Sequence, residues 1–66
     1  MQLTLKNLVA LDHNTTNEFN VGNNVIIQVF KAFDEYLVSD IDNGKTVYQF
    51  CTYCPVHLIK EVNTWT

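Results

Sequence analysis

The most regular alternation of apolar and polar residues lies in segment 36–51, where two β-rich runs meet at Asn43-Gly44. Both central residues of a type I′ turn need a positive φ, which Asn and Gly tolerate better than other residues do. The segment therefore predicts a β-hairpin with a two-residue turn.

The pattern also predicts how the two strands of this hairpin pair. A two-residue turn pairs position 41 with 46, 39 with 48 and 37 with 50. A three-residue turn would instead place apolar residues opposite polar ones, so we favour the two-residue turn. One face of the hairpin is then expected to carry four apolar side chains, those of Leu37, Ile41, Tyr48 and Phe50.

Residues 24–38 admit two interpretations. Four of the first six residues are β-branched, and such residues lose rotamer freedom in a helix but pack well in a sheet. Apolar residues also recur here at helical spacing, and Asn23 or Asn24 can serve as an N-cap. No Glu or Gln follows at the position that completes a capping box. We therefore favour a strand over residues 25–30 and a turn over residues 31–35, which makes residues 24–51 a three-stranded meander.

The flanking segments are less regular. Residues 1–11 fit either a strand with an irregularity or a short helix, and the pattern does not separate the two. Residues 12–18 are all polar and predict a loop, and residues 19–24 predict a turn. Pro55 has no N–H to donate, so we expect it to end the third strand and to introduce a short 3₁₀ turn near residues 55–58, before a last short strand.

The opening Val21-Gly22-Asn23-Asn24-Val25, the meander and the closing stretch 56–62 together resemble the SH3-like small β-barrels, over about residues 19–62. That superfold opens on Val-Gly-x-x-Val, continues as a meander with tight hairpins, and ends in a 3₁₀ turn and a strand. The resemblance implies an all-β fold, a small SH3-like barrel or curled antiparallel meander, in a single domain over residues 1–66. The chain lacks the further glycines of the KOW version and the aromatic and acidic loops of signalling SH3 domains. The resemblance therefore implies a fold and leaves the partner open.

The charge of the chain argues against nucleic-acid binding. The 66 residues carry a net charge of −3, with four lysines and no arginine, whereas nucleic-acid binders cluster Lys and Arg to displace counterions from phosphate. We therefore expect no nucleic-acid groove. The alternative, a nucleic-acid-associated barrel, requires the lysines to converge on one face: Lys6, Lys31, Lys45 and Lys60.

No apolar run approaches the ~20 residues that span a bilayer, so we expect no membrane partner. The stretch 1–6 has neither the basic start nor the apolar core of a secretory signal, and we expect a cytoplasmic protein.

The sequence contains a cluster of possible metal ligands, Cys51-Thr52-Tyr53-Cys54 followed by His57. A zinc site needs four ligands, so His13 would have to close the shell from the distant polar loop. A redox dithiol needs a helix and further strands after the motif, and the chain has too few residues left for a thioredoxin-like fold. We favour packing roles for the two cysteines and expect no cofactor, with a zinc- or redox-dependent protein as the alternative.

Three aromatic residues are the expected binding residues. Most of the eight aromatics should fill the core, and Tyr36, Tyr53 and Trp65 are the ones expected to be partly exposed. Exposed Tyr and Trp are common anchors at protein interfaces. With no catalytic set in the sequence, we expect a non-enzymatic module of a bacterial or phage protein, such as an accessory protein of a phage or mobile element. Its expected partner is another protein or a second copy of the chain, which could pair along a sheet edge.

Overall fold

The computed structural model describes residues 3–22 and 24–65. The first two residues and Asn23, which belongs to the Val-Gly-x-x-Val opening, lie outside this part of the chain. The elements follow in the order α1 (Leu5–Val9), β1 (Thr16–Gly22), β2 (Val25–Ala32), β3 (Glu35–Asp42), β4 (Lys45–Thr52) and α2 (Pro55–Asn63).

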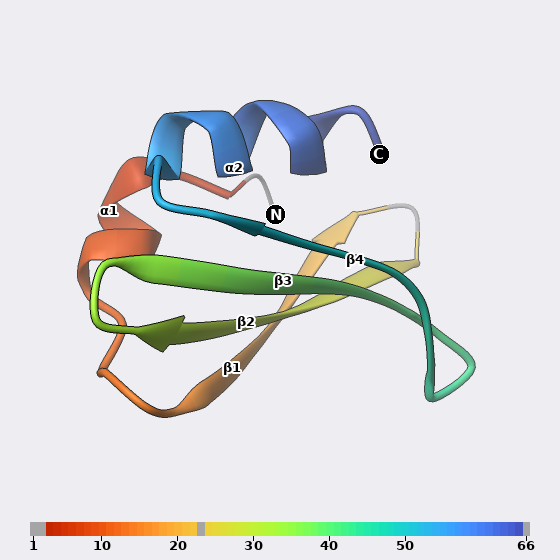
Figure 1. The fold of residues 1–66 in the computed structure, drawn as a ribbon. Coiled ribbons are helices and arrows are strands. Elements are labelled where there is room, and N and C mark those ends of the chain that lie inside the picture. Colours follow the sequence, from red (N-terminus) through yellow and green to blue (C-terminus); the bar gives the residue numbers. More distant parts are fainter. Residues whose placement is uncertain (1–2, 23, 66) are drawn as a thin grey trace.

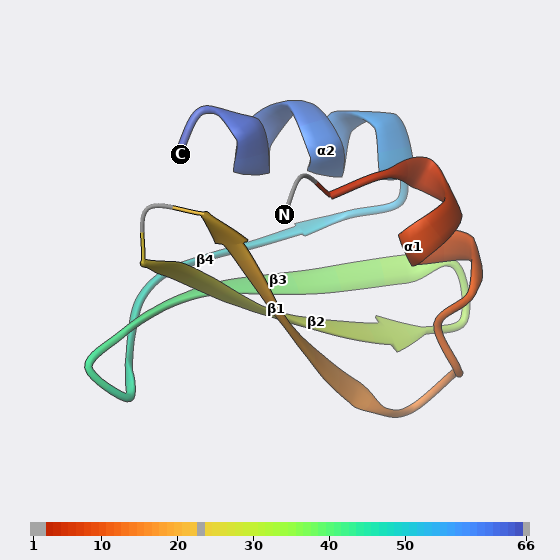
Figure 2. The ribbon, with the colours of Figure 1, turned by 180° about the vertical axis from the view of Figure 1, so that it is seen from behind.

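The four strands form one antiparallel sheet in the order β1-β2-β3-β4, which is a curled meander (Figure 1). The all-β prediction is confirmed, with two short helices added. The sheet is not closed as a barrel, because its outer strands β1 and β4 pair only with their inner neighbours. Seen from behind, α2 lies above the sheet, and α1 lies beside the first turn of α2 (Figure 2).

The strand interpretation of residues 24–38 is confirmed, and the helical alternative is wrong. β2 and β3 pair over seven positions, with Val29 opposite Val38 near the centre. Both valines are completely buried. Sheet packing therefore uses the β-branched residues that a helix would have restricted.

β1 corrects the expectation of a loop over residues 12–18 and a turn over residues 19–24. Its residues Asn17, Phe19 and Val21 alternate with exposed polar neighbours, and Val21 is buried. A strand at the edge of a sheet needs only one apolar face, and the polar residues between these positions mask that period in the sequence.

The β3–β4 hairpin confirms the predicted turn but only part of the predicted register. Asn43 and Gly44 have φ of 52° and 77°, and Ile41 pairs with Thr46 as expected. A bulge at Val47 then shifts the register by one residue. The expected face of Leu37, Ile41, Tyr48 and Phe50 is wrong.

The bulge has a packing consequence. Beyond it, Asp40 pairs with Tyr48 and Val38 with Phe50, so both aromatic rings share a face with buried Val38. That face is the one the helices cover, and Trp65 packs there against both rings. The extra residue thus moves two aromatic side chains from the solvent side of the sheet to the core side.

The C-terminal segment is a helix, so the expected 3₁₀ turn at 55–58 and the final strand are both wrong. Pro55 stands at the first helical position, where its missing N–H costs nothing and its fixed φ suits the helix. Leu58 and Val62 are four residues apart, and both are fully buried against the sheet. The apolar period of this stretch is helical once a sheet face is available to cover it.

The N-terminal segment resolves as a short helix. Thr4 and Asn7 form a capping box, in which the Thr4 side chain accepts a hydrogen bond from the Asn7 backbone and the Asn7 side chain accepts one from Thr4. Leu8 is fully buried and joins a core drawn from both helices, three strands and the residue Leu3 before α1: Leu3, Leu8, Val21, Ile27, Val29, Tyr36, Val38, Leu58 and Val62. Within residues 3–22 and 24–65, no helix has the length and apolar character needed to cross a bilayer.

Candidate functional site

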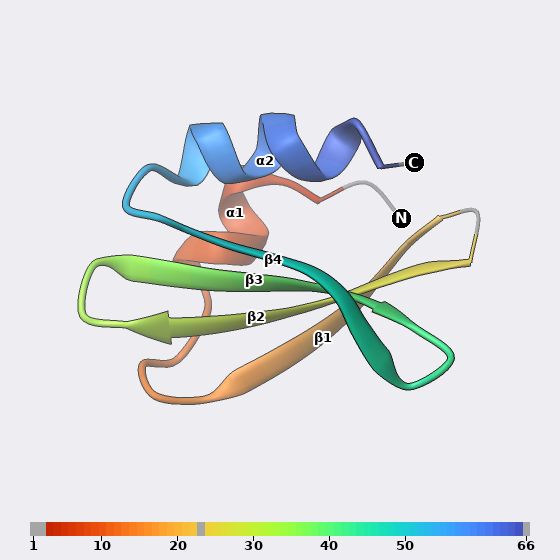
Figure 3. The same ribbon diagram turned by 45° about the vertical axis from the view of Figure 1, so that its right-hand side comes forward.

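The helices cover one face of the sheet, and the opposite face, here called the open face, has no covering element among the described residues (Figure 3). Residues on a strand point alternately to the two faces. Because Ile27 and Val29 point into the core, their neighbours Gln28 and Phe30 belong to the open face. The register extends that face across all four strands.

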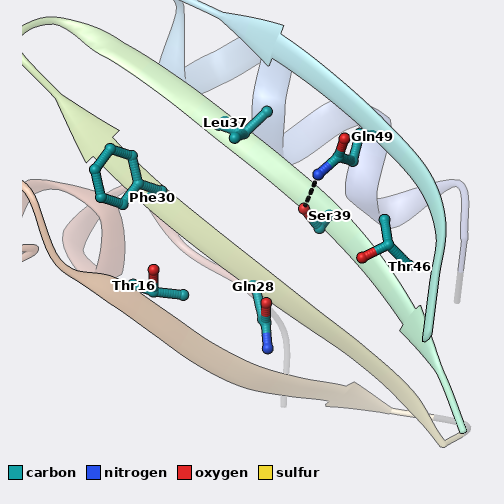
Figure 4. A pocket seen from close by; sticks show the side chains of 7 residues that line it. All are labelled: Thr16, Gln28, Phe30, Leu37, Ser39, Thr46 and Gln49. Atoms are coloured by element: carbon teal, nitrogen blue, oxygen red, sulfur yellow. Dashed lines mark hydrogen bonds between the residues drawn. The ribbon is translucent and has the colours of Figure 1, made fainter. Parts of the chain in front are cut away.

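The open face is hollowed, with a volume of about 250 Å³ (Figure 4). The hollow lies over the middle of the sheet and crosses it from β1 to β4. The residues that line it are Thr16, Gln28, Phe30, Leu37, Ser39, Thr46 and Gln49.

Apolar side chains stand on the open face in directly opposed pairs. Phe30 on β2 faces Leu37 on β3, and Ile26 faces Ile41 four positions further along the pairing. All four are half-buried. Antiparallel sheets commonly expose a polar face to water, so two cross-strand apolar pairs without a covering element make this face the candidate site.

Neutral polar groups surround the apolar pairs. Gln49 Nε2 donates to Ser39 Oγ at 3.0 Å, and Ser39 is buried at 7% exposure (Figure 4). On the other side of β2, Gln28 Nε2 lies 3.4 Å from Glu18 Oε2. A primary amide has two N–H donors and an acceptor oxygen, so both glutamines keep capacity to bind the backbone of a ligand.

The ionised groups that the register places on the open face are acidic. Glu18 on β1 pairs with Gln28, and Glu35 on β3 pairs with Ala32. Lys31 belongs to the other face, where its ammonium lies 5.6 Å from the ring centroid of Tyr36. Counted over its described residues, the open face carries no lysine.

The structure does not bring the three expected binding residues together. Tyr36 is buried at 6% exposure, so its expected exposure is wrong, because its position on β3 points under the helices. Tyr53 is 71% exposed, just before α2. Trp65 lies beyond the other end of α2, half-buried and edge-on to Tyr48 with their ring centroids 5.6 Å apart. The nine-residue helix separates Tyr53 from Trp65.

The cysteine and histidine cluster is also dispersed. Cys51 is exposed on edge strand β4, Cys54 is the exposed residue that precedes α2, and His13 lies in the loop before β1. His57 Nδ1 lies 3.1 Å from Thr52 Oγ1, which also accepts the Cys54 N–H. In the described ranges, no three His, Cys, Asp or Glu side chains group to hold a metal ion. The contacts of Thr52 tie the start of α2 to the end of β4.

The lysines do not assemble into one basic surface. Lys31 stands near the end of β2, and Lys45 begins β4, so antiparallel pairing puts them at opposite ends of the sheet. Lys6 and Lys60 lie on the two helices. This arrangement lacks the continuous basic track that follows a phosphate backbone.

The residues of the open face were missed at the sequence level. The alternate positions around Phe30 and Leu37 carried a signal, but the local pattern does not show which face of the sheet the helices cover. On β4, the positions that share the open face also depend on the bulge at Val47. Comparison with known family models, curated proteins and solved structures finds no match for this chain. Its function must therefore be argued from its own geometry.

Proposed function

We propose that this protein is a non-enzymatic interaction module whose open face binds a segment of a partner protein. The observation that carries the proposal is the cross-strand pair Phe30–Leu37, which stands beside a hollow lined mainly by hydroxyl and amide groups. Apolar anchors supply the driving force of binding, and a few fixed polar groups supply orientation.

The chemistry of the hollow favours binding over catalysis. Its lining contains no ionisable side chain, so it offers no general acid, general base or charged nucleophile for a reaction. Its polar residues are Thr, Ser and Gln, which bind peptide N–H and C=O groups without a change in protonation. An extended or turn segment of a protein supplies both groups.

The proposed setting is the cytoplasm of a bacterial cell, where the protein acts as an accessory protein of a phage or mobile element. Two exposed free thiols, Cys51 and Cys54, suit a reducing compartment. A second copy of the chain is the alternative partner, since the same apolar pairs can meet across a two-fold axis.

Paired leucine variants test the proposal. Leu37→Gln places an amide on the open face, and Leu5→Gln makes the same change at an exposed position on α1, where Leu5 is 47% exposed. With full-length protein as bait in a lysate of the native source, we expect Leu5→Gln to retain the saturable partners of the wild-type chain and Leu37→Gln to lose them. Sedimentation of the same variants tests for a second copy as the partner.

Thermal unfolding must first show that both variants are folded. Equal recovery of partners by Leu37→Gln and the wild-type chain would contradict the assignment to the open face. Absence of any saturable partner and of any self-association would contradict the proposed function itself.

A further inference from the structure

A second surface stands out at the end of the sheet where β2 turns into β3. Ala32 pairs with Glu35, so the turn consists of Phe33 and Asp34 alone. Phe33 has a φ of 55°, and Asp34 is not among the residues with positive φ. This is the pattern of a type II′ turn, whose first central position normally holds glycine.

Phe33 is unfavourable here for the isolated chain in two ways. A bulky side chain at positive φ strains the backbone, and such strain concentrates at sites of function. The ring is also 87% exposed, the largest exposure among the bulky apolar side chains of the described residues. A glycine would relieve the strain and remove the exposed ring. The position therefore carries a feature that stability alone does not explain.

Further exposed apolar side chains lie at the same end of the sheet. Tyr36 pairs with Thr52, so Tyr53 follows directly beside the start of β3 and is 71% exposed. Val56, in the first turn of α2, is 49% exposed. In Figures 1, 2 and 3 the β2–β3 turn and the β4–α2 junction occupy the same end of the molecule.

The charged groups beside this end are mostly carboxylates. Asp34 and Glu35 belong to the turn and its closing pair. The loop that contains Asp12 packs against the end of β2, where the Asn14 N–H donates to the Lys31 carbonyl at 2.7 Å. The ammonium of Lys31 is directed over the Tyr36 ring. An aromatic anchor surrounded by carboxylates complements an apolar site flanked by Lys or Arg.

We infer that Phe33 and Tyr53 are the anchors of a second binding surface, and that its partner is a basic protein segment with apolar side chains between its Lys or Arg residues. The surface lies at the end of the sheet and is distinct from the open face. The inference is therefore independent of the proposed function, and either can fail without the other.

A selection from a displayed library of random peptides tests the inference, with the full-length chain as target. We expect the retained peptides to be enriched in Lys and Arg together with aromatic or aliphatic residues. A synthetic peptide of the enriched sequence is then titrated against the wild-type chain and its variants. Phe33→Gly should weaken binding at least tenfold, and Phe33→Asn, which also accepts a positive φ, should weaken it similarly.

Two matched variants locate the effect. Leu37→Gln on the open face and Leu5→Gln on α1 should both bind the peptide as the wild-type chain does. A melting temperature of Phe33→Gly at or above that of the wild-type chain shows that the loss of binding is not a loss of fold.

Four results would overturn the inference. These are a selection without binders, retained peptides without a basic bias, peptide binding that Leu37→Gln abolishes but Phe33→Gly does not, and a Phe33-dependent dimer in sedimentation. The last result would identify a second copy as the occupant of this surface.

Discussion

The two turns at either end of β3 have the same length and opposite chemistry. At one end, Asn43-Gly44 holds positive φ at both residues, 52° and 77°, which are conformations these two residue types accept. At the other end, the turn Phe33-Asp34 holds the exposed Phe33 at a φ of 55°. Both turns join strands in register, so pairing alone does not require that phenylalanine.

The contrast between the two turns distinguishes residues whose type suits their backbone conformation from a residue whose type does not. Where local preference, turn geometry and register agree, as at Asn43-Gly44, stability is a sufficient explanation of the sequence. At Phe33 the local preference opposes the observed conformation, and the ring gains no burial in return. This mismatch at Phe33 is the observation behind the binding role that we infer for it.

The largest expected change in stability comes from disrupting the Asn43-Gly44 turn, where residue type and conformation agree. Gly44→Val should lower the free energy of unfolding by about 1–3 kcal/mol, because a β-branched residue is forced to positive φ. No atom lies within 4 Å of the position a Cβ would take, so the loss measures backbone strain and not a clash. Urea denaturation measures the loss, and Gly44→Asn, which tolerates this conformation, is the control. An unchanged midpoint would mean that the turn does not need glycine.

A gain in stability is expected from a substitution in the Phe33-Asp34 turn. Phe33→Gly should raise the free energy of unfolding by about 1 kcal/mol, since relief of about 1–3 kcal/mol of strain exceeds the entropic cost of glycine of roughly 0.5–1 kcal/mol. Phe33→Ala removes the ring but keeps a Cβ at positive φ, so it should give little of this gain. Urea denaturation measures both changes in the free energy of unfolding. A destabilised Phe33→Gly would show that the ring supports the fold.

The smallest expected changes in the free energy of unfolding come from alanine substitutions at one residue of each turn. Asn43→Ala should cost on the order of 0.5 kcal/mol, because alanine accepts positive φ less readily than asparagine does. Asp34→Ala should change stability by less than about 0.5 kcal/mol, since Asp34 is exposed and has no positive φ to maintain. Equal losses at the two positions would remove the conformational distinction between the turns.

The sequence predicted the elements whose signals are local. The β-branched run at the start of β2 and the Asn43-Gly44 turn both indicated structure that the sheet confirms. β1 was missed, because an edge strand with one half-buried face shows few apolar residues. The helix α2 was missed because Pro55 suggested an end to regular structure, while its buried face depends on Leu58 and Val62 meeting the sheet.

The exposure of the aromatic side chains was harder to predict than the fold. Tyr36 was expected to be exposed and is buried, since its face of β3 is the one that the helices cover. Trp65 has a docking place against Tyr48 and Phe50, which reach that face only through the bulge at Val47. The bulge residue in β4 therefore decides which aromatic rings pack on the face that the helices cover.

By itself, the sequence determined the charge of −3, the turn at Asn43-Gly44 and the strand character of residues 25–30, because each depends only on residue type and near neighbours. Tertiary structure decided the register of β4, the helix after Pro55, the exposure of Phe33 and the burial of Tyr36. These depend on which face of the sheet receives the helices. A one-residue shift in pairing exchanges the two faces of a strand, and the local pattern of residues does not fix that shift.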